Sequence, residues 1–328
     1  MKKNKKPLVV GNWKTNPATY NEARERFQAI KRASANHKGI DVVICPPFPY
    51  IFTLNSLAGK GVVGIGAQDV SIYGTGSKTG EVSASMIETS GAKYVIIGHS
   101  ERRAMGDTDT VVAAKITQAL KTDMTIILCV GESERDVEGE YLNVIKKQLK
   151  EALHPVSRSQ FGQIIIAYEP IWAIGRTDNV AITSYDLHQM VIFIKKYLKE
   201  NYNETTASMM PILYGGSVTA ENAQDILWNG EVQGLFVGRA SFEAETFAPL
   251  LSAVDARQKA TIKVASKVKR MVPEKFHQVK KIEKMRKEAA PKKAVKKVIR
   301  HKKIVKKMKA KKIVKKVKKV KKIKKGKK

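Results

Sequence analysis

Eight short runs of mostly branched apolar residues recur through the first 240 residues, and they limit the possible folds more than any other feature. They are PLVVGNW from Pro7, DVVICPP from Asp41, VVGIGAQ from Val62, YVIIGHS from Tyr94, TIILCVG from Thr125, IIIAYEP from Ile164, PILYGGS from Pro211 and GLFVGRA from Gly234. Each is apolar at consecutive positions, which is typical of strands buried on both faces.

The segments between these runs have the three- and four-residue apolar spacing of helices, as in Tyr20 to Ala35, Val111 to Lys121 and Ser184 to Leu198. Eight alternations of strand and helix in about 250 residues predict an α/β fold, a closed parallel (β/α)8 barrel. An open doubly wound sheet is the alternative. It is disfavoured because no G-x-G-x-x-G motif opens a helix.

The net charge of +31 is concentrated at one end of the chain. Residues 259–328 hold 33 lysines and arginines and only three acidic residues, whereas residues 1–258 hold 28 basic and 27 acidic residues. A near-neutral body is therefore joined to a polycation. We predict two domains, a barrel at 1–258 and a lysine-rich tail at 259–328.

Polar or small residues follow most of the predicted strands. They are Asn12, Lys14, Gln68, His99, Glu132, Glu169, Gly215 to Ser217, and Gly238. In a barrel the carboxyl ends of all strands meet on one face, so these side chains would converge there. Each alone could be an ordinary polar residue at the start of a loop, but their joint occurrence predicts a catalytic site.

Six motifs carry a resemblance to a known family. They are GNWK at 11–14, TGEVSA at 79–84, YVIIGHSERR at 94–103, LCVGE at 128–132, AYEPIWAIG at 167–175 and YGGSV at 214–218. In order and spacing the chain resembles triosephosphate isomerases from about Pro7 to Leu251. The resemblance implies a TIM barrel and an aldose–ketose isomerase of glycolysis and gluconeogenesis. The implied enzyme is a homodimer that interconverts dihydroxyacetone phosphate and D-glyceraldehyde 3-phosphate through an enediolate, without cofactor or metal.

The same resemblance implies the roles of the catalytic residues. Glu169 is the base that moves a proton between C1 and C2, and His99 is a neutral electrophile at the carbonyl oxygen. Lys14 offsets negative charge, and Asn12 fixes the substrate oxygen. The sequence adds one argument for a neutral His99: Ser100 is a good N-cap residue, so the imidazole would face the positive end of a helix.

Substrate binding is implied for Asn12, Lys14, the Gly175 N–H, Ser217 and Gly238. The apolar segment 171–175 would serve as a lid over the substrate. Arg239 stands where the family usually has a second glycine. Its side chain could contact the phosphate or point into solvent, and the sequence leaves both open.

Other residues of the motifs have supporting roles in this interpretation. We expect Glu101, Arg102 and Glu132 to form ion pairs that fix Lys14 and the loops rather than to act on substrate. Thr79 is the implied contact with a second subunit. Cys45 and Cys129 lie in strand-like runs, which predicts two buried thiols in a reducing compartment. No histidine or cysteine cluster has the spacing of metal ligands.

No apolar stretch is long enough to cross a bilayer, and Leu8 to Val10 is too short for a signal peptide core. Both observations predict a cytoplasmic protein.

The tail repeats lysine pairs separated by Val, Ile or Met, and prolines interrupt it at 273 and 291. Its charge density predicts a disordered or partly helical segment. Three interpretations stay open: sequence-independent binding to nucleic acid, binding to an anionic membrane surface, which we weigh lower, and no partner at all. A barrel without activity that only carries this tail is the alternative function.

Overall fold

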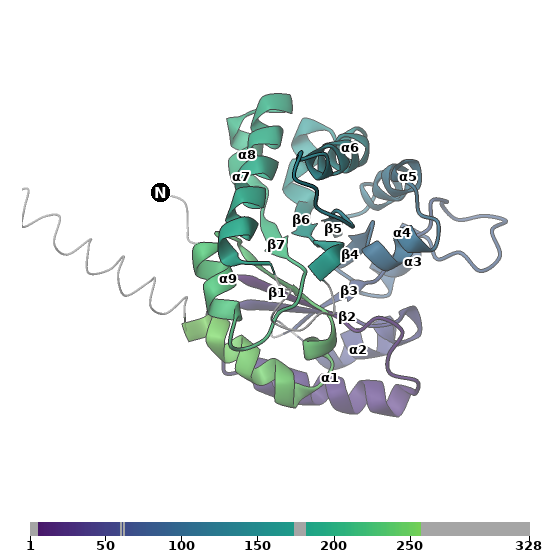
Figure 1. Cartoon of the computed structure of the whole chain (residues 1–328). Coiled ribbons are helices and arrows are strands. Elements are labelled where there is room, and N and C mark those ends of the chain that lie inside the picture. The colour runs from purple at the N-terminus through teal and green to yellow at the C-terminus, as the bar shows by residue number, and fades with distance from the viewer. Residues whose placement is uncertain (1–5, 60, 62, 174–181, 257–328) are drawn as a thin grey trace, which may run out of the picture. The chain divides into compact units, whose positions relative to one another are not determined.

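A computed structural model describes residues 6–256, apart from 60, 62 and 174–181 (Figure 1). Its centre is a closed barrel of eight strands in sequence order, and each strand is parallel to both neighbours. The strands are β1 Leu8–Asn12, β2 Asp41–Cys45, β3 Gly64–Ala67, β4 Tyr94–Ile97, β5 Thr125–Val130, β6 Ile164–Tyr168, β7 Ile212–Tyr214 and β8 Gly234–Val237. All eight predicted strands are therefore confirmed.

Helices follow the strands and cover the outside of the barrel (Figure 1). They include α1 Tyr20–Ser34, α2 Ile51–Ala58, α3 Ala84–Thr89, α4 Ser100–Ala104, α5 Asp109–Ala119, α6 Tyr141–Leu153, α7 Ser184–Asn201, α8 Glu204–Met209 and α9 Ala223–Asn229. Residues 244–256 after β8 are also helical. Short 3-10 turns lie at η1 Phe48–Tyr50, η2 Arg158–Gln163, η3 Ile171–Ala173 and η5 Arg239–Ser241.

The three predicted helices are present, with ends set by their caps. A capping box formed by Thr19 and Glu22 starts α1. The Thr108 hydroxyl accepts the Val111 N–H, so α5 begins two residues before the predicted start. Apolar periodicity does not detect the polar first turn of a helix, which explains this difference.

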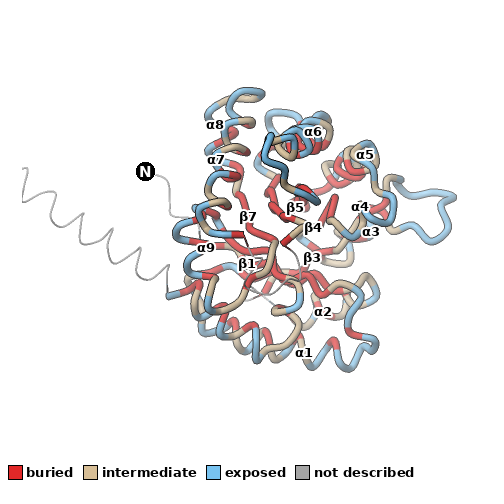
Figure 2. Tube along the Cα trace, in the orientation of Figure 1, coloured by how far each residue is buried: buried red, intermediate tan, exposed pale blue. Residues whose placement is uncertain are grey.

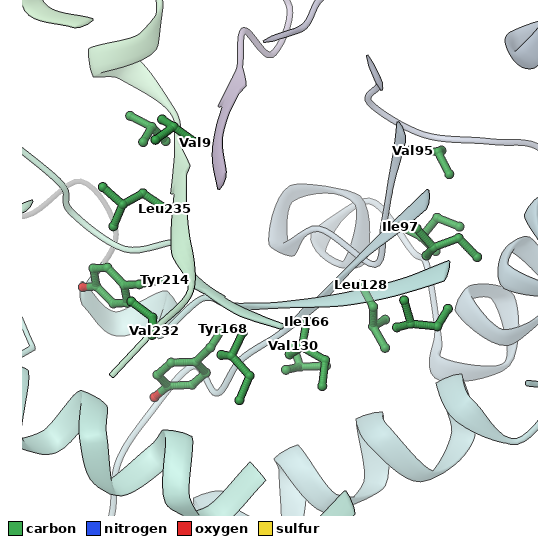
Figure 3. Close-up of a cluster of buried hydrophobic side chains, with 14 of the residues drawn as sticks. Val9, Val95, Ile97, Leu128, Val130, Ile166, Tyr168, Tyr214, Val232 and Leu235 are labelled. Carbon is green, nitrogen blue, oxygen red and sulfur yellow. The ribbon is translucent and has the colours of Figure 1, made fainter. Parts of the chain in front are cut away.

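The strands are buried on both faces, as their consecutive apolar residues predicted (Figure 2). One buried cluster contains strand residues only and fills the barrel interior: Val10, Val43, Cys45, Ile96, Ile127, Cys129, Ile165, Ala167, Leu213 and Phe236. A second, larger cluster joins the outward-facing strand residues to the helices. Figure 3 shows part of it, including Val9, Leu128 and Tyr168.

One glycine permits the barrel to close. Leu8 of β1 pairs with Gly234 of β8. A Cβ atom at Gly234 would lie 2.0 Å from the Leu8 carbonyl oxygen, so no larger residue fits without moving the backbone. Among the helices that the structure describes, none is long and apolar enough to cross a membrane.

Candidate active site

A cavity of about 670 Å³ lies at the carboxyl ends of the strands, where the sequence placed a site. Its lining includes seven of the predicted site residues, namely Asn12, Lys14, His99, Glu169, Ser217, Gly238 and Arg239. The eighth, Gly175, lies outside the described residues. Residues more than 220 positions apart in the sequence thus share one cavity because the barrel brings the strand ends together.

Lys14 is held in an unusual backbone conformation directly after β1. Its φ is 54°, a left-handed value that is costly for a residue with a Cβ. The Asn12 Oδ1 accepts the Lys14 N–H at 3.0 Å, and the Gln68 amide donates to the Lys14 carbonyl at 2.7 Å. The Lys14 Nζ lies 2.6 Å from Glu101 Oε1, which confirms the predicted ion pair. Fixing Lys14 against this strain suits a binding role.

Arg102 and a buried lysine join the neighbouring loops. The Arg102 guanidinium contacts Asp69 at 3.0 Å and Asp107 at 3.5 Å. The buried Lys115 Nζ contacts the same two carboxylates at 2.8 and 2.5 Å. Arg102 is therefore a structural residue in this network, as predicted, and it is not part of the cavity lining.

His99 itself caps α4, which corrects the prediction that Ser100 is the N-cap. Ser100 is the first helical residue, and the His99 Nδ1 accepts the Glu101 N–H at 3.2 Å. Since Nδ1 is an acceptor, the ring proton is on Nε2 and the imidazole is neutral. The Nε2 lies 3.4 Å from Glu169 Oε1. The hydrogen bond from the Glu101 N–H to His99 Nδ1, rather than the dipole of the five-residue helix α4, thus accounts for the neutral imidazole.

Glu169 directly follows β6 and is only 3% exposed. Two glycines provide the space for it. A Cβ at Gly131 would lie 1.8 Å from the Glu169 carbonyl oxygen, and one at Gly215 would lie 2.7 Å from the Glu169 Cγ. The Glu169 N–H also donates to the Val130 carbonyl at 2.8 Å. The backbone of this carboxylate is therefore closely held.

Burial raises the pKa of Glu169 above its ordinary value. Interactions with His99, the Cys129 thiol, the Ser100 N–H and Lys14 oppose this rise only in part. A carboxylate with a raised pKa is a stronger base than one in water, so the site is built for proton abstraction.

The predicted buried thiols are confirmed, but the position of one was not foreseen. Cys45 and Cys129 are buried and free. The Cys129 thiol hydrogen-bonds to Glu169, and burial together with that carboxylate raises the pKa of the thiol well above its usual range. Cys129 therefore stays protonated as a donor. Its inward-facing place on β5, next to β6, was the only sequence signal for this contact.

Ser217 links the cavity to the turn that follows Glu169. Its hydroxyl donates to the Ala173 carbonyl at 3.1 Å, and the Asn222 amide donates to the Ser217 carbonyl at 3.2 Å. The predicted lid begins at this turn, with η3 Ile171–Ala173. Its continuation at 174–181 lies outside the described residues.

Gly238 and Arg239 form the wall beside Lys14. A Cβ at Gly238 would lie 3.6 Å from the Lys14 Cε, so the backbone here is close to the lysine side chain. Arg239 begins η5 and is exposed at the cavity. These residues give one side of the cavity a concentration of positive charge, which suits an anionic substrate.

Comparison with known proteins identifies the family. The family model described as triosephosphate isomerase matches residues 7–254. The chain belongs to the triosephosphate isomerase family. The triosephosphate isomerase of Thermus thermophilus is 42% identical over 246 residues, covering 74% of this chain and 97% of that protein. That of Moorella thermoacetica is 39% identical over 251 residues, covering 76% and 98%.

A solved structure supports the same assignment. The crystal structure of triosephosphate isomerase from Bartonella henselae matches with a TM-score of 0.66 and 31% identity, covering 76% of this chain and 98% of that one. The chain is therefore an enzyme of the aldose–ketose isomerase class with a TIM barrel, as its motifs predicted. Within the described residues, no group of three or more His, Cys, Asp or Glu side chains could hold a metal ion.

Proposed function

We propose that this chain interconverts dihydroxyacetone phosphate and D-glyceraldehyde 3-phosphate, as a triosephosphate isomerase of glycolysis and gluconeogenesis. One observation carries the proposal. A buried carboxylate with a raised pKa lies 3.4 Å from the protonated nitrogen of a neutral imidazole, in a cavity that also contains Lys14. A base and a hydrogen-bond donor in contact with one substrate are what proton transfer next to a carbonyl requires.

In the proposed mechanism Glu169 removes a proton from C1 of the ketose while the His99 Nε2–H donates to the carbonyl oxygen. The C–H electron pair moves to form an enediolate, whose charge is stabilised by Lys14 and His99. A proton passes from the C1 oxygen to the C2 oxygen by way of His99, and Glu169 returns its own proton to C2. The C1 oxygen then forms the carbonyl of the aldose. Asn12 orients the substrate oxygen beside Lys14. The Asn12 side chain is itself held in place, because its Oδ1 accepts the backbone N–H of Lys14.

We propose that the opposite end of the substrate, the phosphate dianion, is bound by Ser217 and Gly238 together with Gly175. Backbone N–H groups at small residues can approach an anion closely. Arg239 adds a cation at this wall, because its side chain lies at the cavity and makes no hydrogen bond or ion pair with the residues that the structure describes.

A coupled assay with each triose phosphate tests this function. We expect turnover in both directions with the full chain and no requirement for added metal or cofactor. Absence of turnover by a folded protein would instead support the alternative, a scaffold without activity.

The raised pKa of Glu169 predicts the pH dependence of this reaction. The base must be ionised, so kcat/KM should fall as the pH decreases through the pKa of Glu169. Because burial raises that pKa, the acid limb should lie above the value of about 4.5 expected for an exposed glutamate. A pH profile of kcat/KM for glyceraldehyde 3-phosphate measures it. An acid limb at or below the ordinary value would contradict the proposed environment of the base.

We also propose a homodimer in the cytoplasm. The segment 73–81, which includes Thr79, is exposed along nearly all its length, and Met86 and Met105 are 48% and 74% exposed nearby in the chain. Exposed apolar side chains of this kind suit a subunit interface. Sedimentation at twice the mass of the chain would support the dimer.

The proposed cytoplasmic location rests on the cysteines. Two free buried thiols suit a reducing compartment.

For the tail we propose a separate domain at 259–328 that binds nucleic acid without sequence preference. Its net charge of +30, carried almost wholly by lysine, favours contacts with phosphates over contacts with bases. Its only aromatic residue is Phe276, so stacking on bases contributes little.

Truncation tests this proposal. The full chain and a chain ending at Gln258 are titrated with a labelled random-sequence DNA duplex over a range of salt. We expect tight binding by the full chain that weakens steeply as salt increases, and loss of this binding on truncation. Equal weak binding by both chains would contradict it, and anionic vesicles would then test the membrane alternative.

A further inference from the structure

Glu132 is a buried carboxylate that hydrogen-bonds to residues on both sides of Glu169 in the chain. It is 1% exposed and lies two residues after the end of β5. Its Oε1 accepts the Tyr168 hydroxyl at 2.8 Å and the Trp172 Nε1–H at 2.9 Å. Its carbonyl accepts the Ile171 N–H at 2.9 Å. The residue before Glu169 and the turn after it are therefore both attached to Glu132.

Arg135 supplies the cation for this carboxylate. Its Nε donates to Glu132 Oε1 at 3.0 Å, and its Nη2 donates to the Tyr168 hydroxyl at 3.0 Å. The same guanidinium lies 5.0 Å from the Trp172 ring and 5.2 Å from the Tyr141 ring. Arg135 thus contacts the carboxylate and both side chains that the carboxylate holds.

This arrangement depends on the charge and shape of the guanidinium. Among the described residues Arg135 is the one ion-pair partner of Glu132. A buried carboxylate that loses such a partner is strongly destabilised, because it has been removed from water without compensation. Such a carboxylate would then shift its hydrogen bonds. A lysine could supply charge but not two donors in one plane over an aromatic ring.

Arg135 itself does not line the cavity, so it has no direct route to the substrate. Its effect on the reaction must pass through Glu132 or through the Tyr168 and Trp172 side chains, which it also contacts. A displacement of the base by about 1 Å can cost a hundredfold in rate, so a residue that fixes the segments flanking Glu169 can matter greatly for kcat.

We propose that Arg135 is a positioning residue for Glu169 and that it acts by neutralising Glu132, which holds Tyr168 and Trp172. The inference rests on the proposed role of Glu169 as the base. It adds a residue outside the cavity to the determinants of the reaction.

A double-mutant cycle tests the proposal, with steady-state kinetics on the full chains of the parent, R135Q, E132Q and the double variant. We expect R135Q to lower kcat by about ten- to a hundredfold, with KM changed less than about twofold. In the E132Q background no buried charge needs a partner, so the further change R135Q should then have little effect. The inhibition constant of inorganic phosphate should be unchanged in R135Q, because Arg135 is not among the proposed phosphate ligands.

Lys147→Gln is the matched control, since Lys147 is an exposed cation on α6 and removing it changes the net charge equally. It should leave kcat unchanged. If R135Q does not fold, R135M, which also removes the charge, takes its place in the same cycle. Two results would overturn the proposal. One is an equal decrease in kcat on changing Arg135 in the parent and in the E132Q background, and the other is an unchanged kcat in R135Q. An inactive parent chain would instead overturn the proposed function.

Discussion

Replacing Glu169 by glutamine should lower kcat by about a thousandfold or more while the fold stays intact. The amide has the shape of the carboxylate but cannot accept the proton, and general base catalysis contributes about 10² to 10⁴ in rate. KM should change little, because the proposed phosphate ligands lie elsewhere in the cavity. Steady-state kinetics and circular dichroism of the full chain measure both. Retention of more than about a tenth of the parent kcat would remove Glu169 from the role of base.

The same variant should be more stable than the parent at neutral pH. Burial raises the pKa of Glu169, so the folded state holds this proton more tightly than the unfolded state does. The group therefore favours folding below its unfolded pKa, and that contribution is lost as the pH rises through its folded pKa. Glutamine avoids this loss. The gain in the free energy of unfolding should disappear in acid, and denaturant titrations at several pH values would show it.

Replacing Lys14 by methionine should lower kcat/KM by about a thousandfold. Methionine retains the length of the side chain but removes the charge that, in the proposed mechanism, faces both the substrate phosphate and the enediolate. Both kcat and KM should change, in contrast to Glu169→Gln, because the ammonium binds the ground state as well as the transition state. The decrease in kcat/KM should depend only weakly on salt concentration, since Lys14 lies at a cavity wall rather than on an open surface.

Lys150→Met is the control for Lys14→Met, because Lys150 is an exposed residue of α6 away from the cavity. It should have the parent kinetics. If Lys14→Met raised KM alone, the lysine would be a phosphate ligand without a role in stabilising the enediolate. If it had no effect, the proposed anion site would be wrong.

The barrel could be predicted from the sequence because its strands have a distinctive pattern. Runs such as Ile164–Tyr168 are apolar at every position, and burial on both faces requires that. The apolar pattern does not locate helix ends, since Thr108 begins α5 through a side-chain hydrogen bond outside that pattern. The convergence of Asn12, His99 and Glu169 followed from the topology alone, once the strand count was known.

Contacts across strands could not be predicted in the same way. The Cys129 thiol meets Glu169 only because β5 and β6 pair in a particular register. Arg135 reaches Glu132 through a loop whose course the sequence does not specify. His99 takes the capping position from Ser100 because of its backbone angles, which residue preferences do not determine. Geometry of this kind appears only when the chain is folded.

The most direct test of the account is to follow glyceraldehyde 3-phosphate by proton NMR in D₂O with the full chain and with Glu169→Gln. A base that exchanges its proton with solvent at the enediolate stage should place deuterium at C1 of the dihydroxyacetone phosphate formed. We predict rapid conversion with deuterium at C1 for the parent chain and almost none for Glu169→Gln. Equal conversion by both chains, or no conversion by the folded parent, would contradict the account.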